Sequence, residues 1–176
     1  IGVDAYNGTV LWETALPNFR RVGAMRDSGS MVASENILYA LAEDRCHLLA
    51  TPHGKELRQF HTPPRADKAP RHWGYLAHVG NELYGSTTRV GAARRDHSRQ
   101  QISETYYDFI PLVTSDSVFC RERTQGDLKW DYRPASGAII NPTITVAAGR
   151  VYFVESTNPA TLKSPTGRST LQQLVG

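Results

Sequence analysis

The chain has 176 residues, of which 40% are hydrophobic and 21% charged, as in an ordinary globular domain. No apolar run approaches the roughly 18 residues that a membrane-spanning helix needs, so the sequence excludes such a helix. The net charge of +3 over 176 residues produces only a weak electrostatic field, which argues against nucleic acid as a partner. The basic residues are nevertheless mostly arginine, with 16 Arg and 4 Lys.

The first predicted element is a β-hairpin over residues 1–16. Asn7-Gly8 stands between two short apolar runs, and Asn-Gly in this setting is a strong hairpin signal. Trp12 follows Gly8 by four residues, and Asp4 precedes Gly8 by four. This spacing of acid, glycine and tryptophan recurs further along the chain.

Residues 28–61 predict a complete four-stranded unit. The apolar runs are short and interrupted by Gly, Asn and Pro, which favours strands over helical repeats with their 3.6-residue periodicity. The last two strands surround a second copy of the turn, with Gly54, and with Arg58 in the place of tryptophan. The strands are expected near residues 29–34, 36–42, 45–51 and 56–61.

Residues 72–133 predict a second unit of this kind, interrupted by a polar insertion at 89–112. They carry the third copy of the motif, with Glu122, Gly126 and Trp130 at the same spacing. The three glycines lie 46 and 72 residues apart, so one period is about 45 residues and the next is lengthened by the insertion. A similar period separates the tyrosines of a second hairpin pattern, Tyr39, Tyr84 and Tyr152.

The last predicted element is residues 139–156, the first two strands of a fourth unit. The rest of the segment 139–176 is a polar tail that is expected to lead toward the outer strands of that unit. The unit at the N-terminus is also partial, because residues 1–16 supply only its last two strands.

The repeated motif has a physical reason. A glycine can adopt positive φ at a turn between two outer strands. The tryptophan that follows can then pack between neighbouring units and bury roughly 150–250 Å² of ring, with its indole N–H donating to a main-chain carbonyl of the next unit. Arg58 is expected to stack in the same place through its guanidinium plane. The motif residues Asp4, Gly8, Trp12, Gly54, Arg58, Glu122, Gly126 and Trp130 are therefore predicted to be structural.

A period of about 45 residues with four strands is typical of a β-propeller blade. The Asp-x₃-Gly-x₃-Trp pattern resembles the tryptophan-docking motif of pyrroloquinoline-quinone-type β-propellers, which include quinoprotein alcohol dehydrogenases and a non-catalytic outer-membrane assembly lipoprotein. Where the family has Ala and Thr, this chain has Gly2 and Asn7 in the first copy and Cys120 and Gln125 in the last. The resemblance covers about residues 1–156 and implies an all-β fold, a partial β-propeller of four-stranded antiparallel blades.

The chain supplies too few blades for a seven- or eight-bladed ring of the kind that the resemblance implies. We therefore expect a fragment of a larger exported protein, located in the periplasm or at the cell surface. This location follows from the resemblance alone. The alternative is a four-bladed ring, closed by pairing residues 1–16 beside 139–156.

A predicted inner strand carries His72, Trp73 and His78, a candidate ligand or partner surface. The even spacing of the two histidines predicts that they share one face of the strand, where they either line the channel or bind a metal or an anion. Cys46 and Cys120 are expected to be buried free thiols, with a single disulfide as the alternative.

The insertion carries Arg94, Arg95 and Arg99, which are expected to form either a solvated loop or a lid over the channel. A third functional hypothesis depends on them: a polyanion-binding surface, which would bind heparin with a steep salt dependence.

The preferred hypothesis is a non-catalytic binding scaffold whose propeller face recognises a protein or a small molecule, with no catalytic residue, metal site or cofactor predicted in this segment. The alternative is part of a quinone-dependent dehydrogenase that oxidises alcohols or sugars. The resemblance would then imply pyrroloquinoline quinone, a Ca²⁺ held by carboxylate and amide oxygens, an Asp base and an adjacent Cys–Cys disulfide. The chain has no Cys–Cys pair, and its 17 acids are dispersed.

Overall fold

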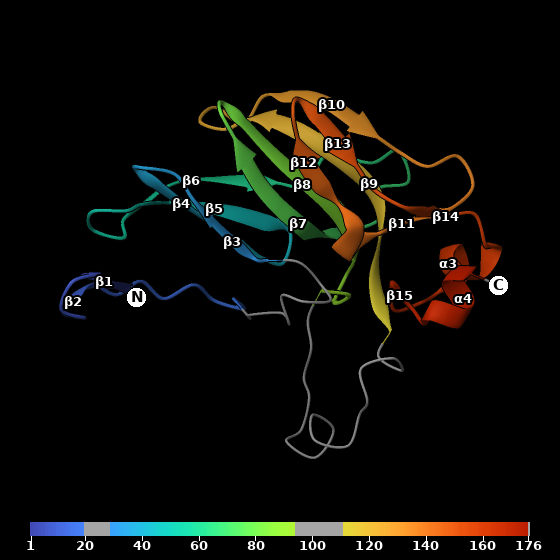
Figure 1. Ribbon diagram of the computed structural model, residues 1–176, viewed down its shortest axis with the longest axis horizontal. Coiled ribbons are helices and arrows are strands. Elements are labelled where there is room, and N and C mark those ends of the chain that lie inside the picture. The colour runs from blue at the N-terminus through green and yellow to red at the C-terminus, as the bar shows by residue number, and fades with distance from the viewer. Residues whose placement is uncertain (20–28, 94–110, 176) are drawn as a thin grey trace, which may run out of the picture.

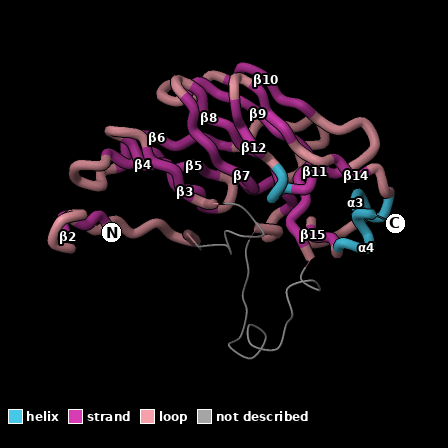
Figure 2. The backbone as a smooth tube through the Cα atoms, in the orientation of Figure 1, coloured by secondary structure: helices cyan, strands magenta, loops and turns pink. Residues whose placement is uncertain are grey.

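The computed structural model describes residues 1–19, 29–93 and 111–175 (Figure 1). The chain is mostly β, in several antiparallel sheets, with short helices near the C-terminus (Figure 2). The predicted all-β class is therefore confirmed. Among the described residues, no helix is long and apolar enough to cross a membrane.

The N-terminal hairpin consists of β1 (Gly2–Val3) and β2 (Val10–Trp12), which pair antiparallel. The next sheet has four strands in chain order, each antiparallel to its neighbour. Its strands coincide with the four predicted within 28–61, because short apolar runs alternate there with turn residues. They are β3 (Met31–Ala33), β4 (Ile37–Ala42), β5 (Arg45–Ala50) and β6 (Glu56–His61).

The largest sheet has seven strands in the order β14-β11-β9-β8-β7, with β10 and β15 also paired to β9. The predicted unit over residues 72–133 supplies four of them in succession. The strands are β7 (Arg71–Val79), β8 (Glu82–Arg89), β9 (Leu112–Glu122), β10 (Leu128–Tyr132), β11 (Ala138–Ile140), β14 (Glu155–Ser156) and β15 (Arg168–Ser169).

Strand β9 has 11 residues and β10 only 5, so β10 leaves part of β9 unpaired, and segments from the C-terminal part of the chain pair with it. β10 pairs with residues 118–121 of β9, while β11 and β15 pair with residues 112–115. The backbone of β9 beyond the end of β10 needs hydrogen-bond partners, and β11 and β15 supply them. Parts of segment 139–176 thus join the large sheet, whereas the sequence predicted that they belong to a fourth unit.

A separate hairpin of β12 (Thr145–Ala147) and β13 (Arg150–Tyr152) follows the short 3-10 helix η2 (Asn141–Thr143). The tail then forms α3 (Pro159–Lys163) and α4 (Leu171–Val175), with β15 between them. Asn158 caps α3, because its side chain accepts a hydrogen bond from the Ala160 N–H. The tail, which the sequence predicted to lead toward the outer strands of a fourth unit, thus forms two short helices and one strand of the large sheet.

Two apolar clusters hold the sheets together. The first joins the four-stranded sheet to β7, β8 and β9, and its buried members are Tyr39, Leu41, Cys46, Leu48, Phe60, Trp73, Leu76, Leu83 and Phe119. The second joins the opposite face of the large sheet to the β12–β13 hairpin, and it includes Val118, Ile139, Ile144, Tyr75, Val151 and Phe153. The large sheet thus covers the four-stranded sheet on one face and is covered by the β12–β13 hairpin on the other. Both cysteines are free and buried, as predicted.

Candidate functional site

The three glycine hairpins share one backbone arrangement. In each, the glycine N–H donates to the carbonyl four residues earlier: Gly8 to Asp4, Gly54 to Ala50 and Gly126 to Glu122, over 2.8, 2.8 and 3.1 Å. The glycines have φ of 73°, 67° and 85°, a region that other residues rarely adopt. The three copies therefore have the same turn despite their different sequences.

The acid of the motif caps this turn. Asp4 Oδ1 accepts hydrogen bonds from the N–H groups of Tyr6 and Asn7, at 2.8 and 3.1 Å. Glu122 likewise accepts from the N–H groups of Thr124 and Gln125. Partial burial would raise the pKa of Glu122, but these backbone hydrogen bonds, with one from the Thr124 hydroxyl, outweigh it and lower the pKa to about 2. The acids thus stabilise the turns.

Trp12 covers the turn of the second copy. Its indole N–H donates to the Thr51 carbonyl at 2.7 Å, and the Thr14 hydroxyl donates to the Gly54 carbonyl at 2.7 Å. Gly54 is buried, and a Cβ built on it would lie 2.3 Å from Cε3 of Trp12. The ring can therefore lie here only because position 54 has no side chain.

The second copy covers the turn of the third in a different way. Arg58 donates through Nη1 to the carbonyl and the side-chain oxygen of Gln125, at 3.1 and 2.8 Å. The ring over Gly126 belongs to Phe60, because a Cβ on Gly126 would lie 2.4 Å from Phe60 Cε1. Arg121 adds a bond from Nη2 to the His61 carbonyl at 2.9 Å. Arg58 thus binds the turn through hydrogen bonds, and Phe60 supplies the cover.

The roles of Thr14 and Phe60 were not predicted. Both stand six residues after the glycine of their own copy, as Tyr132 does in the third. The shared offset of six could have identified these positions. In the first two copies, the residues four and six after the glycine both contact the next turn: Trp12 and Thr14 at the turn of Gly54, and Arg58 and Phe60 at the turn of Gly126.

Trp130, the tryptophan of the third copy, is 39% exposed. Its ring tilts against Tyr84, with centroids 6.2 Å apart, and its backbone pairs with Cys120. Tyr132 on the same strand contacts Phe153 and donates its hydroxyl to Glu155. Among the described glycines, none has Trp130 lying over it, whereas Trp12 covers the turn at Gly54.

The prediction that His72 and His78 share a face is wrong. The pairing of β7 with β8 shifts between Trp73 and Tyr75, so His72 lies opposite Thr88 and His78 opposite Leu83. These positions on β8 are five residues apart, which puts the histidines on opposite faces of the sheet. His78 stacks on Tyr39 with centroids 5.9 Å apart.

Trp73 is a core residue. It is 2% exposed, and its indole N–H donates to the Asp44 carbonyl at 3.1 Å. Its ring makes an edge contact with Phe119, with centroids 4.8 Å apart. Trp73 is therefore not available as a ligand surface.

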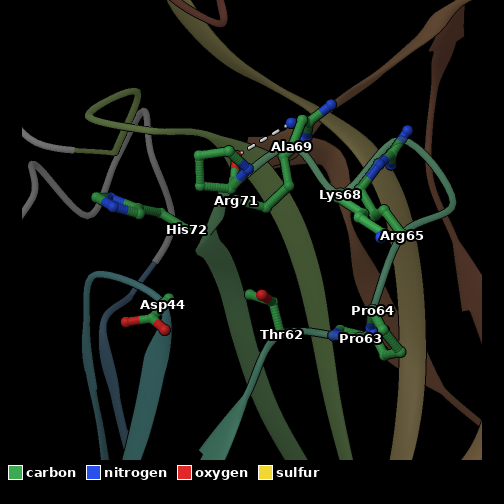
Figure 3. A pocket seen from close by; sticks show the side chains of 10 residues that line it. Asp44, Thr62, Pro63, Pro64, Arg65, Lys68, Ala69, Arg71 and His72 are labelled. Atoms are coloured by element: carbon green, nitrogen blue, oxygen red, sulfur yellow. Dashed lines mark hydrogen bonds between the residues drawn. The ribbon is translucent and has the colours of Figure 1, made fainter.

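His72 lines an open cavity of about 370 Å³ (Figure 3). Asp44 and Thr62 lie on one side of it, below His72 and Arg71 in that view. The complete lining is Asp44, Thr62, Pro63, Pro64, Arg65, Lys68, Ala69, Pro70, Arg71 and His72.

The cations around this cavity are largely neutralised by acids. Arg71 Nε lies 2.5 Å from Asp116, and Arg65 Nη1 lies 3.2 Å from it. Asp116 sits at a break in the pairing of β9 with β8, where a bulge turns its side chain toward both arginines. Of the arginines and lysines described in the lining, Lys68 alone has no acidic partner. The cavity therefore offers little net charge to an anion.

Arg94, Arg95 and Arg99 lie outside the described residues, so the predicted surface on the insertion has no structural description. Within the described part of the chain, no three His, Cys, Asp or Glu side chains come together as a metal site. The sites with a defined geometry are thus the three glycine hairpins, at Gly8, Gly54 and Gly126, and the cavity beside His72.

Neither a scan against protein-family models nor a search of the curated proteins found a match to this chain.

Proposed function

We propose that this chain is a non-catalytic interaction module made of pyrroloquinoline-quinone-type β-propeller repeats, within a larger exported protein. The observation that carries the proposal is the exposed face of β10 that carries Trp130 and Tyr132, which we call the docking face. Trp130 stands where Trp12 stands in the first copy, yet it is 39% exposed and bonded to no neighbouring turn in the described chain. Exposed aromatic rings on a rigid strand are a common basis of protein recognition.

The propeller architecture is part of this proposal. Its support is the packing of the four-stranded sheet on the large sheet and of the large sheet on the β12–β13 hairpin, together with the three hairpins that share one hydrogen-bond pattern. Blades in a propeller meet face to face in this manner and repeat the same strands radially. The periplasmic or cell-surface location remains an inference from the resemblance.

The enzyme alternative is tested directly. Pyrroloquinoline quinone and Ca²⁺ are added to the protein, and absorbance and dye reduction are recorded with alcohols and sugars. An interaction module shows neither cofactor uptake nor dye reduction, and a known quinoprotein run in parallel proves that the assay works. Reproducible dye reduction would overturn the proposal.

The exposure of Trp130, on which the proposal rests, has its own test. Acrylamide should quench the fluorescence of Trp130 and leave that of the buried Trp73 largely unaffected. Trp130→Phe should remove most of the quenchable fraction. A wild-type protein whose tryptophans are all protected would show that the docking face is already covered.

A further inference from the structure

The open cavity beside His72 lies where the four-stranded sheet meets the large sheet. Its walls are the β4–β5 turn, which carries Asp44, and the connection of residues 62–70 from β6 to β7. Trp73 in β7 fixes the two sheets to each other at this point, because its backbone and indole N–H groups donate to the carbonyls of Glu43 and Asp44, at 2.8 and 3.1 Å. The cavity is therefore built between two sheets of the described chain.

A closed ring of alternating charges fixes one wall of the cavity. Arg65 contacts Asp67 and Asp116, at 3.4 and 3.2 Å, and Arg71 contacts the same two acids, at 3.4 and 2.5 Å. The two arginine side chains are only 18% and 13% exposed. Charge networks of this kind hold their geometry better than single exposed pairs do. The ring therefore holds the β6–β7 connection against β9, so the wall is preorganised for a ligand.

This wall still offers hydrogen-bond donors to the cavity. A guanidinium has five N–H donors, and the bonds of Arg71 to Asp116, Asp67 and the Pro70 carbonyl use three of them. Lys68 on the same wall has no acidic partner among the described residues. Its φ is 53°, a region that residues other than glycine rarely adopt, and backbone strain of this kind is concentrated at ligand sites.

The turn of Asp44 forms the other side of the cavity and offers acceptors. Asp44 Oδ2 lies 2.9 Å from His61 Nδ1, and Oδ1 lies 3.7 Å from Arg45 Nε. A carboxylate has about four acceptor sites, so these two contacts leave it able to bind a further donor. Thr62 lies beside it, because its N–H donates to the Asp44 carbonyl at 3.1 Å. Figure 3 shows Asp44 and Lys68 on opposite sides of the cavity.

The charges of the cavity favour a ligand that carries both signs. The two arginines and two aspartates of the ring cancel, which leaves the Lys68 ammonium on one side. On the other side, the Asp44 carboxylate is 45% exposed, and an exposed partner 3.7 Å away, Arg45, neutralises it only in part. A simple anion would leave Asp44 without a partner, and a simple cation would leave Lys68 without one.

The size and the remaining lining narrow the ligand further. A volume of about 370 Å³ lies within the range of roughly 300–1,000 Å³ that is usual for small-molecule sites. Apolar surface accompanies the charged groups, and it suits an aliphatic side chain. It comes from Pro63, Pro64, Ala69 and Pro70.

We propose that this cavity binds a free aliphatic α-amino acid. Lys68, with the unused N–H groups of Arg71, holds the carboxylate, and Asp44 holds the ammonium group. The site shares no residue with the docking face of β10, so this inference does not rest on the proposed function and adds a small ligand to it.

Isothermal titration of the purified chain with three probes tests both ends of the ligand. L-leucine should bind saturably, with a Kd below about 1 mM. N-acetyl-L-leucine, which has no ammonium group, and L-leucinamide, which has no carboxylate, should each bind about 10-fold or more weakly, because one charged hydrogen bond is lost. The absence of saturation by L-leucine up to about 10 mM, or an analogue that binds as tightly as L-leucine, would overturn the proposal.

Two variants assign the two ends. Lys68→Ala should weaken the binding of L-leucine about 10-fold and should no longer distinguish it from L-leucinamide, because the partner of the carboxylate is gone. Asp44→Asn should likewise no longer distinguish L-leucine from N-acetyl-L-leucine. A variant that keeps the full wild-type preference for L-leucine over its analogue would contradict the assignment.

Lys55→Ala is the matched control. It also removes one exposed lysine, from the β5–β6 turn at the other end of strand β5 from Asp44, and its Kd for L-leucine should equal that of the wild type. Thermal unfolding without ligand checks that the variants are folded. The titration of the wild type with the two analogues needs no variant, so it decides the proposal even if Asp44→Asn unfolds.

Discussion

Trp12 and Trp130 occupy the same place in the same hairpin, but their surroundings differ. Trp12 lies over Gly54 and donates its indole N–H to the Thr51 carbonyl, while Trp130 is 39% exposed and contacts Tyr84. The difference lies in the neighbour, because the hairpins themselves share their turn and their strand pairing. The motif thus positions the tryptophan ring, and the ring is covered only where a glycine turn of the next copy packs against it.

The largest expected difference is between the stabilities of the Gly54→Ala and Gly8→Ala variants. Gly54→Ala should lower the free energy of unfolding by roughly 3–5 kcal/mol, because left-handed strain adds to the clash of the new Cβ with Trp12. Gly8→Ala carries the same strain without the clash, and should cost about 1–2 kcal/mol. Urea unfolding of the two variants measures the difference, and equal losses would mean that Trp12 does not lie against Gly54.

The next effect compares the tryptophans themselves. Trp12→Ala should cost about 3 kcal/mol, because it opens the packing over Gly54 and leaves the Thr51 carbonyl without its donor. Trp130→Ala should cost about 1 kcal/mol in the monomer, since it loses mainly the contact with Tyr84. Thermal unfolding in dilute protein provides both values. A larger loss for Trp130 than for Trp12 would contradict the assignment of covered and exposed faces.

A smaller effect concerns pH and distinguishes the third turn from the second, which has Ala50 in place of the acid. The pKa of Glu122 is lowered to about 2, so its ionised form stabilises the fold at pH values above its ordinary pKa near 4.5. This stabilisation should disappear as the pH falls from about 4.5 to about 2. Glu122→Gln should flatten the dependence of the unfolding midpoint on pH in that range. Part of the slope should persist, because the carboxyls of Asp67 and Glu82 also have lowered pKa values.

The smallest effect belongs to Arg58, the residue that replaces tryptophan in the second copy. Its hydrogen bonds to Gln125 are exposed, so Arg58→Ala should cost only about 0.5–1 kcal/mol. Phe60→Ala should cost roughly 3–5 kcal/mol, because this ring is 5% exposed and covers Gly126. Urea unfolding ranks the two variants. A larger loss for Arg58 would show that the guanidinium, and not the phenylalanine ring, holds the two hairpins together.

Local sequence was sufficient for much of the fold. The strands within 28–61 agree with their predicted positions, because ILYALA and RCHLLA are short apolar runs separated by turn residues. The glycine turns were also predictable, since each depends on a positive φ within five residues of chain. The acceptor of the Trp12 indole was predicted as a type of group, a main-chain carbonyl, but not as Thr51 in particular.

The errors share a physical cause. The bulge between Trp73 and Tyr75 lies in the pairing of β7 with β8, and it moves His78 to the face opposite His72. The pairing of β11 with β9 depends on the backbone that β10 leaves unpaired. Such effects involve residues far apart in the chain, and no local spacing predicts them.

By itself, the sequence determined the β class, the hairpins and the three glycine turns, because these depend on apolar alternation and on backbone conformation over a few residues. Only the tertiary structure decided which turns are covered. It seats Trp12 on Gly54 and Phe60 on Gly126, while Gly8 and Trp130 stay exposed. Covering a turn requires a second sheet at the right distance, and that distance is set by the packing of whole sheets.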